Sequence, residues 1–552
     1  MADGATLKVE DKDICTWFDL LRADQELIDR VNDKKLPEEE AKKLKKEAVY
    51  EFPIALKERF PSLNLYDGDT VGVGEGGRAT GSDEQWACVC SLAVMTTCLR
   101  AYIAHEAGDA EVVTKATDML TQYQKARGSM LFGVAHPPAP LSEDNVVQWG
   151  ESLRKHASTP EMMGASYLTM VIHDLTKVKS IVAPLAEKYP QYNDEALTAQ
   201  FIDAVCDSDI KEWNKHMLTD IKNCDKDMRR AIQEGFQTGF NASQVMQGES
   251  TSVDGHKVAM FLKKHPTALW FMDHYLLDTA GILGKKHAFI GSVIVNRDTF
   301  EPYNAYINCL VSGDPGGGDP SRGVAVPENA DTSHRAYHEY RMQKVGADDG
   351  ELKDGLEAMA TELGVRPEEM RVAFARTVEL SRATTNAAAL GLLNCWQKAK
   401  ERFGPELMSG LVTELNIDGL AKGPPVGPES NDPTKVSVML EYSPKALNDA
   451  AKGSDWEAEV AILLGLFAVL WRCGRAAIVA QYEAGELRNP YTVTINPIAM
   501  RTAPKYAESS GYTWLQWFSE MLSAWKQSNA LAPLLEKAVC AKELQLEWAA
   551  NI

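Results

Sequence analysis

The sequence lacks the short motifs by which most large enzyme families are identified. It contains no G-x-x-x-x-G-K-[ST] phosphate loop, no G-x-S-x-G nucleophile turn and no H-E-x-x-H zinc-binding helix. A G-x-G-x-x-G match occurs at 72–77, but a dinucleotide site also needs a buried strand before the first glycine, and 63–69 is a poor strand. We therefore interpret 66–81 as a glycine-rich loop and expect no enzyme of these families.

Long apolar stretches and paired cysteines are also missing. No apolar stretch lies near the start, and the apolar run at 460–471 is too short for a membrane span, which needs about 20 residues. The ten cysteines are scattered through apolar helical patterns and include no C-x-x-C pair. We expect reduced core thiols, an intracellular protein and no contact with a membrane.

Positive charge is scarce. The chain has 58 lysines and arginines against 78 aspartates and glutamates, which gives a net charge of −20. Such a balance argues against a protein that coats nucleic acid with its whole surface, but it permits one that holds nucleic acid in a local groove. It also suits a shell protein whose wall must not adhere to its contents.

The apolar patterns predict a mainly α fold. Across 552 residues, 45% are hydrophobic and 25% are charged, as in globular proteins. Between about 109 and 239 nothing alternates helices with strands, so no parallel sheet is expected there. The clearest helix spans 456–482 and is apolar on every face, which indicates the core helix of a large helical lobe.

A proline- and glycine-rich stretch divides the sequence. Residues 313–331 include three consecutive glycines and several prolines, which predicts a hinge loop. We expect an N-terminal helical lobe at 1–312 and a C-terminal helical lobe at 332–552. The best strand candidates, 288–296 and 303–311, predict a small β-hairpin or an extended arm near 288–311.

The segment 256–297 differs from the rest of the chain because six basic residues there face only two acidic ones. Basic residues interleaved with aromatic rings are typical of a groove for single-stranded nucleic acid, in which cations neutralise phosphates and Trp270 or Tyr275 stacks on bases. The other interpretation is that the rings are core and the lysines are their solvated neighbours. The candidate RNA-binding residues of this segment are Lys257, Lys263, Lys264, Trp270, Tyr275, Lys285, Lys286 and Arg297.

Basic character continues beyond the predicted hinge. Arg335 and Arg341 lie on the helix that opens the second lobe, and Arg371 and Arg376 lie on the long helix that Pro367 starts. We expect Arg335 and Arg341 to line the RNA cleft, with Arg371 and Arg376 as possible additions.

A few residues leave room for an enzyme with a scattered site. His334 and His338 are four residues apart and can share one helical face, and Asp314 and Asp319 lie in the hinge loop. No third ligand is indicated, so we expect neither a bound metal nor a cofactor.

The chain resembles, in its architecture, the nucleoproteins of negative-strand RNA viruses. Its opening Lys12-Asp13…Trp17-Phe18 and its ending Asn551-Ile552 are similar to nairovirus nucleoproteins. It does not contain the Phe…Tyr…Ser-x-Ala-Met-Gly pattern of paramyxovirus nucleoproteins, so no residue role is carried over from that family. The resemblance implies a bilobed helical protein that holds single-stranded RNA between its lobes and exchanges arms with neighbouring copies.

This interpretation predicts a viral nucleocapsid protein, not an enzyme, which encapsidates genomic RNA without sequence specificity in the virion and host cytoplasm. Expected partners are single-stranded RNA, further copies of the chain through exchanged arms or terminal helices, and a viral polymerase or phosphoprotein. The alternatives are an icosahedral shell protein of a double-stranded RNA virus, which the acidity favours, and the all-helical enzyme.

Overall fold

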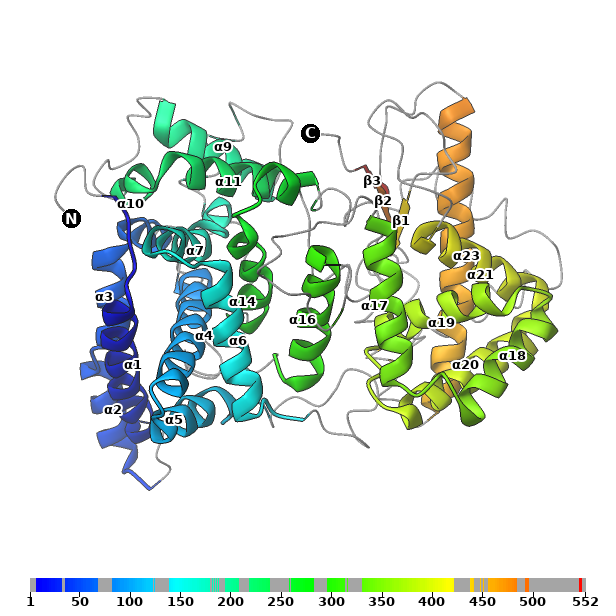
Figure 1. The fold of residues 1–552 in the computed structure, drawn as a ribbon, viewed down its shortest axis with the longest axis horizontal. Helices are drawn as coiled ribbons and strands as arrows, with labels where there is room; N and C mark the ends of the chain where they lie inside the picture. The colour runs from blue at the N-terminus through cyan, green and yellow to red at the C-terminus, as the bar shows by residue number, and fades with distance from the viewer. Residues whose placement is uncertain are drawn as a thin grey trace. The chain divides into compact units, whose positions relative to one another are not determined.

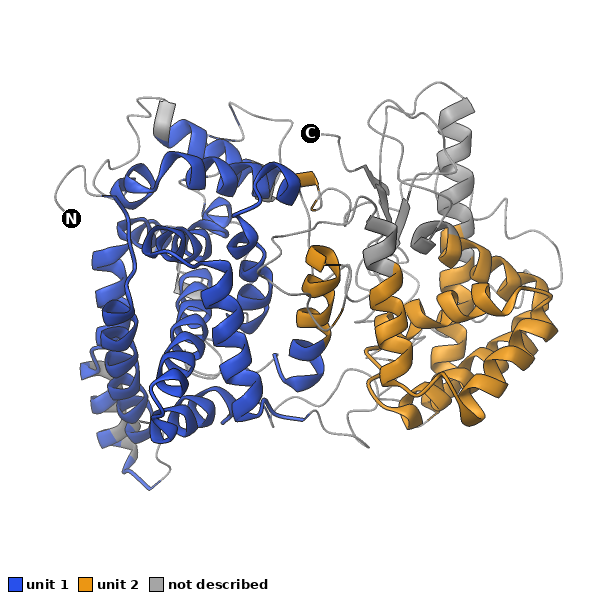
Figure 2. Ribbon diagram, viewed as in Figure 1, with its two compact units in different colours: residues 1–127, 138–240, 261–301 blue, residues 128–137, 241–260, 302–552 orange. Residues whose placement is uncertain are grey.

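The computed structural model divides into two compact units (Figure 2). Unit 1 comprises 1–127, 138–240 and 261–301, and unit 2 comprises 128–137, 241–260 and 302–552. The residues that the structure describes are 6–31, 35–67, 82–122, 124, 139–178, 181, 183, 185, 187, 194–207, 218–238, 258, 260–281, 295–312, 315, 330–420, 437–440, 447, 450, 455–483, 492–495 and 546–548.

The predicted mainly α class is confirmed, because helices make up most of the described residues (Figure 1). The elements of unit 1 are α1 (Asp11–Val31), α2 (Glu38–Glu47), α3 (Glu51–Arg59), η1 (Pro61–Asp67), α4 (Ser82–Glu106), α5 (Ala110–Thr121), α6 (Glu143–His156), α7 (Pro160–Ile172), η3 (Leu175–Lys177), α9 (Asp194–Asp207), α10 (Thr219–Asn223), α11 (Lys226–Gln237), η5 (Leu269–Phe271) and α14 (Asp273–Gly281). Helix α16 (Arg297–Ser312) crosses the division between the units.

Unit 2 is a helical cluster with one small sheet. Its elements are α17 (Ala330–Lys344), α18 (Gly350–Leu363), α19 (Pro367–Ser381), α20 (Asn386–Phe403), α21 (Pro405–Leu420), β1 (Ser437–Leu440), α23 (Trp456–Glu483), β2 (Thr492–Ile495) and β3 (Leu546–Trp548). Strand β2 pairs in parallel with β1 and antiparallel with β3, with Val493 opposite both Val438 and Trp548.

Helix α4 is the core of unit 1. It packs against α1, α5, α6 and α14 (Figure 1), and its residues from Cys88 to Leu99 are buried. A helix buried on every side cannot be amphipathic, which explains why its apolar residues show no preferred face. Cys88, Cys90 and Cys98 lie within this buried stretch as free thiols, which confirms their prediction as core residues.

Two glycines allow the neighbours of α4 to approach it closely. A Cβ atom at Gly150 of α6 would overlap the backbone carbonyl of Cys98, and one at Gly281 of α14 would overlap the side chain of Ser91 and the carbonyl of Ala87. The α4–α6 and α4–α14 contacts therefore depend on the absence of a side chain at these positions.

Helix α23 is the core of unit 2 and confirms the helix predicted over 456–482. It packs against α20 and α21, and Phe467 and Trp471 are fully buried along it. Gly465 faces the ring of Phe403 on α20, where an added Cβ would overlap the ring. The apolar run thus serves as the predicted core helix.

The strand predicted at 303–311 is wrong, because these residues belong to α16. The buried residues Tyr303, Tyr306, Ile307 and Leu310 follow the i, i+3, i+4, i+7 spacing of a helix face. Residues 288–294 of the predicted hairpin lie outside the described residues. Most of 313–331 also lies outside the described residues. The two lobes and the hinge predicted there therefore stay a prediction.

Within the described part of the chain, Glu84–Glu106 is long and apolar enough to cross a membrane by length and composition. Of its most apolar stretch, 78% is buried within the protein. This burial is the pattern of a core helix.

Gly150→Ala tests the close approach of α4 and α6. The new methyl group has no space beside the Cys98 carbonyl, so we expect a loss of roughly 1–3 kcal/mol in the free energy of unfolding. Gly410→Ala is the control, because nothing lies within 4 Å of a Cβ there on α21, and we expect a gain of up to about 1 kcal/mol. Urea unfolding followed by circular dichroism measures both, and an unchanged midpoint for Gly150→Ala would contradict the packing.

Candidate nucleic-acid interface

Three of the twelve predicted RNA-binding residues, Lys257, Lys285 and Lys286, lie outside the described residues. The other nine divide into buried side chains, a paired arginine and exposed cations. Only the exposed cations can meet a phosphate without a change in structure.

The two predicted base-stacking residues are buried, which corrects their assignment. Trp270 in η5 is 1% exposed and Tyr275 in α14 is 4% exposed. They belong to an aromatic core in which Phe271 lies 5.2 Å from Phe236 and 4.6 Å from His274, measured between ring centroids. Burial lowers the pKa of His274 to about 3, as expected in an apolar site. The aromatic spacing of this segment therefore reflects core packing, and neither ring offers a face to a base.

Two predicted phosphate ligands are buried as well. Arg341 is 5% exposed and donates a hydrogen bond to the carbonyl of Ala383 at 2.8 Å. Arg376 is 2% exposed, donates to the carbonyl of Leu415 at 3.3 Å and lies over the ring of Trp471. Buried guanidinium groups need such partners, so both arginines serve the core of unit 2 and are unavailable to RNA.

Arg371 is held by two carboxylates. Its Nη2 lies 2.9 Å from Glu339 Oε2 and 2.6 Å from Asp348 Oδ1, and its Nη1 donates to the carbonyl of Ala347. A phosphate would have to displace both carboxylates, so Arg371 is a poor candidate.

Exposed cations remain in both units. Arg335 on α17 and Arg297 at the start of α16 are exposed. Lys263 and Lys264 are exposed in the segment that precedes η5. These four residues are the predicted contacts that the structure leaves accessible.

Lys264 belongs to a cluster of basic residues around one carboxylate, and the exposed Lys263 directly precedes it in the chain. Glu234 on α11 accepts hydrogen bonds from Lys264 Nζ at 2.6 Å, from His265 Nε2 at 2.7 Å and from Arg230 Nε at 2.9 Å. We call Arg230, Lys263, Lys264, His265 and Glu234 the α11 basic cluster. It sets three permanent cations against one anion in a strongly acidic protein.

Packing holds this cluster together. Helix α11 starts at Asp225, whose side chain accepts from the backbone of Asp227 and Met228. Its apolar side places Phe236 against Phe271, and Gly235 lets the Phe271 ring approach the helix backbone. Glu234 therefore faces the segment that carries Lys264.

The electrostatics of Glu234 follow from its partners. Partial burial opposes ionisation, but the hydrogen bonds from Lys264, His265 and Arg230 outweigh it and lower the pKa of Glu234 to about 2. At neutral pH the carboxylate is ionised and competes with any phosphate for Lys264 and Arg230.

Arg230 is the member of the cluster that the sequence analysis missed. It lies four residues before Glu234 and forms an i, i+4 pair with it, a spacing that the sequence displays. The contact of Glu234 with Lys264 and His265 joins residues about 30 apart and has no local signal.

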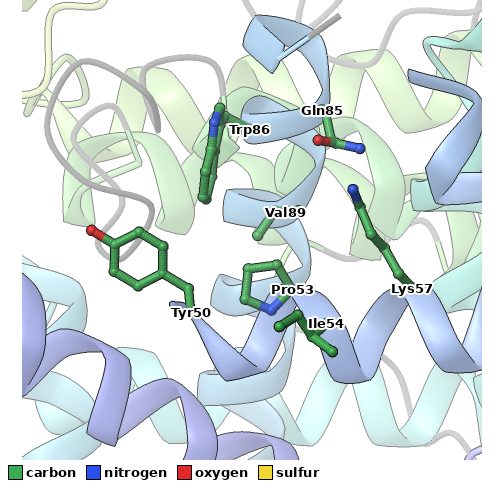
Figure 3. A pocket seen from close by; sticks show the side chains of 7 residues that line it. All are labelled: Tyr50, Pro53, Ile54, Lys57, Gln85, Trp86 and Val89. Atoms are coloured by element: carbon green, nitrogen blue, oxygen red, sulfur yellow. The ribbon is translucent and has the colours of Figure 1, made fainter. Parts of the chain in front are cut away.

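A pocket of about 230 Å³ lies at α3 and the start of α4 (Figure 3). The Tyr50 and Trp86 rings meet edge to face at 6.2 Å, and the nearby Ile54 is 41% exposed. The lining residues that the structure describes include no histidine, cysteine or carboxylate, so these walls suit an apolar side chain and not acid–base chemistry. The lining residues are Tyr50, Pro53, Ile54, Lys57, Gln85, Trp86 and Val89.

Of the residues named for the enzyme alternative, the structure describes the side chain of His338 alone. His338 Nδ1 lies 2.7 Å from Glu379 Oε1, and both side chains are buried in unit 2. This is a core pair. The side chain of His334, and Asp314 and Asp319, lie outside the described residues.

A comparison of this chain with protein-family models, curated proteins and solved structures finds no match.

Glu234→Gln tests the electrostatics of the α11 basic cluster. Because the folded-state pKa of Glu234 is depressed, its stabilisation is present above about pH 4.5 and is lost as the pH falls towards 2. Between pH 6 and pH 3 we expect the wild type to lose about 1–2 kcal/mol more stability than Glu234→Gln, with allowance for solvent screening. The exposed Glu26→Gln on α1 is the control and should follow the wild type in urea unfolding. If the free energy of unfolding changed with pH in the same way for the wild type and Glu234→Gln, the low pKa assigned to Glu234 would be contradicted.

Proposed function

We propose that this protein is a viral nucleocapsid protein that binds single-stranded RNA without sequence specificity and self-assembles around it. The observation that supports the proposal best is the α11 basic cluster, which presents Arg230, Lys263 and Lys264 to solvent in a chain of net charge −20. A local cationic surface on an acidic protein fits a groove that follows a phosphate backbone.

The proposed binding is by phosphate and not by base. Ammonium and guanidinium groups recognise the charge that every nucleotide carries, so they do not discriminate among sequences. Stacking by Trp270 and Tyr275 is no part of the proposal, because both rings are buried. Arg297 and Arg335 are the remaining exposed candidates for further phosphate contacts.

Assembly is the second half of the proposal. We infer contacts between copies of the chain through exchanged arms or terminal helices, and a viral polymerase or phosphoprotein as a further partner. The apolar pocket beside Ile54 and Trp86 offers one place where a neighbouring protein could insert a side chain. The protein would act in the virion and the host cytoplasm, with no membrane partner.

The main alternative is a closed shell protein of a double-stranded RNA virus. The net charge of −20 supports it, because an acidic wall does not retain the enclosed genome. It differs from the proposal in a measurable way, since the free subunit would have negligible affinity for RNA. The all-helical enzyme has less support, because His338 is committed to a buried pair.

The double charge reversal Arg230→Glu with Lys263→Glu tests the RNA site. Loss of two phosphate contacts should weaken binding of a fluorescent poly-uridine oligonucleotide by roughly tenfold or more. It should also make the plot of log K against the logarithm of the salt concentration less steep, by about 1.4 in slope. Fluorescence anisotropy of RNA-free protein over a salt series measures both quantities.

The matched control is Lys115→Glu with Lys155→Glu, which makes the same change in net charge on α5 and α6. It should reduce affinity much less. Equal affinities for the wild type and both variants would refute the α11 basic cluster as the site. Absence of RNA binding by the wild type, together with closed spheres in negative stain and a protein-like ratio of absorbance at 260 and 280 nm, would favour the shell protein.

Glu234→Gln should have the opposite effect on RNA. In the wild type, Lys264 and Arg230 must give up their ion pairs with Glu234 before they contact a phosphate. Glu234→Gln removes these ion pairs, so we expect roughly fivefold tighter RNA binding at low salt. The same anisotropy titration measures it, with Glu26→Gln as the control. Weaker binding by a folded Glu234→Gln variant would mean that Glu234 orients the cations and does not compete for them.

A further inference from the structure

A second cluster of ionisable side chains lies in unit 1. His173 directly follows α7, Asp174 directly precedes η3, and Asp278 lies on α14. One ligand atom from each residue can be chosen so that all three atoms lie within 4.8 Å of one another. The adjacent residues His173 and Asp174 and the distant Asp278, 105 residues beyond His173, therefore bring one imidazole and two carboxylates to one point.

Two of the three spacings among these atoms are close to the edges of a zinc coordination sphere. His173 Nε2 lies 3.1 Å from Asp278 Oδ1 and 3.5 Å from Asp174 Oδ2. Tetrahedral ligands placed at about 2.05 Å from Zn²⁺ are about 3.3 Å apart. Both distances lie close to that value, so an ion could be bound with small movements of the side chains.

The surroundings of His173 orient it as a ligand. Its Nδ1 donates a hydrogen bond to the carbonyl of Met170 at 2.7 Å, which directs Nε2 towards the carboxylates. A backbone carbonyl on the second ring nitrogen is the usual support of a metal-bound histidine. Asp174 is oriented in turn by Lys177 Nζ at 2.8 Å.

A proton on His173 Nε2 is the competing interpretation. An imidazolium N–H can bond well to one carboxylate, and Asp278 at 3.1 Å fits that role. The 3.5 Å separation from Asp174 is too long for a good second hydrogen bond. Asp174 Oδ2 accepts instead from Lys177 Nζ at 2.8 Å, whereas an ion between the three atoms would bind both carboxylates and the imidazole together.

Charge and access are compatible with a divalent ion. The two aspartates face Lys177, which also lies 3.4 Å from Glu84 of α4, so the carboxylates outnumber the ammonium group. His173 and Asp174 are buried, but the Asp278 side chain is 39% exposed and gives an ion a path from solvent. One imidazole with two carboxylates is a donor set that zinc accepts.

We propose that His173, Asp174 and Asp278 bind one zinc ion, which links α7, η3 and α14. The ion would add a cross-link between helices that pack on the core helix α4. This proposal does not depend on RNA binding.

Zinc binding by the full chain tests the proposal. Chelator-treated protein is titrated with Zn²⁺ alone against a chromophoric zinc chelator, and thermal unfolding is followed with and without Zn²⁺. The wild type should bind one zinc per chain and unfold at a higher temperature when zinc is present. Asp278→Asn should bind zinc at least roughly tenfold more weakly, because it removes a ligand charge.

Asp273→Asn is the matched control. Asp273 lies on the same helix and pairs with His156 Nδ1 at 2.8 Å, and in the described part of the chain no second carboxylate forms an ion pair with that histidine. It should bind zinc as the wild type does. Equal zinc binding by the wild type, Asp278→Asn and Asp273→Asn would mean an adventitious ion only and would overturn the proposal. An unfolding temperature of the wild type that does not change when zinc is added would also overturn it.

Cobalt covers the case in which Asp278→Asn fails to fold. Co²⁺ bound to the wild type in a tetrahedral nitrogen and oxygen site should give visible absorption bands, which Zn²⁺ should abolish by displacement. Absence of these bands in folded wild-type protein would overturn the site without the help of any variant.

Discussion

The rest of the structure depends on the enclosure of two helices, α4 and α23, that have no polar face. Burial of apolar area, at about 25 cal/mol per Å², is the main favourable contribution to folding, and a helix that is apolar all round gains it only when neighbours cover every side. In unit 1 the neighbours are α1, α5, α6 and α14, and in unit 2 they include α20 and α21. Glycines at 150, 281 and 465 allow the close contacts that this enclosure requires.

The same constraint decides which polar groups reach the surface. Arg341 and Arg376 are buried in unit 2. Backbone carbonyls contact both guanidinium groups in place of water, and an indole ring lies against that of Arg376. The aromatic residues of the basic segment that the structure describes are likewise buried in packing around Phe271. Among the predicted RNA contacts in the described part of unit 1, Lys263, Lys264 and Arg297 stay exposed, and Glu234 holds Lys264 close to Arg230. A pre-formed carboxylate contact lowers affinity for phosphate but holds the cations in place until a stronger anion arrives.

The two proposed sites use opposite charge and different burial. The α11 basic cluster is exposed and cationic, as electrostatic attraction of a polyanion requires. The cluster at His173 is mostly buried and carries an excess of carboxylates, as capture of a cation requires. The described groups of both sites lie in unit 1, so neither site depends on how the two units are arranged.

The sequence by itself determined the helical class, the core helix over 456–482 and the buried cysteines, because helical periodicity is a local property that packing then preserves. It misassigned 303–311, where β-favouring residues hid a helix face spaced at i, i+3, i+4 and i+7. Only the tertiary structure decided which cations stay exposed, that Lys264 meets Glu234, and that His173 meets Asp278, 105 residues away. The reason is physical: such contacts depend on how helices pack against one another, and no local pattern of residues records that packing.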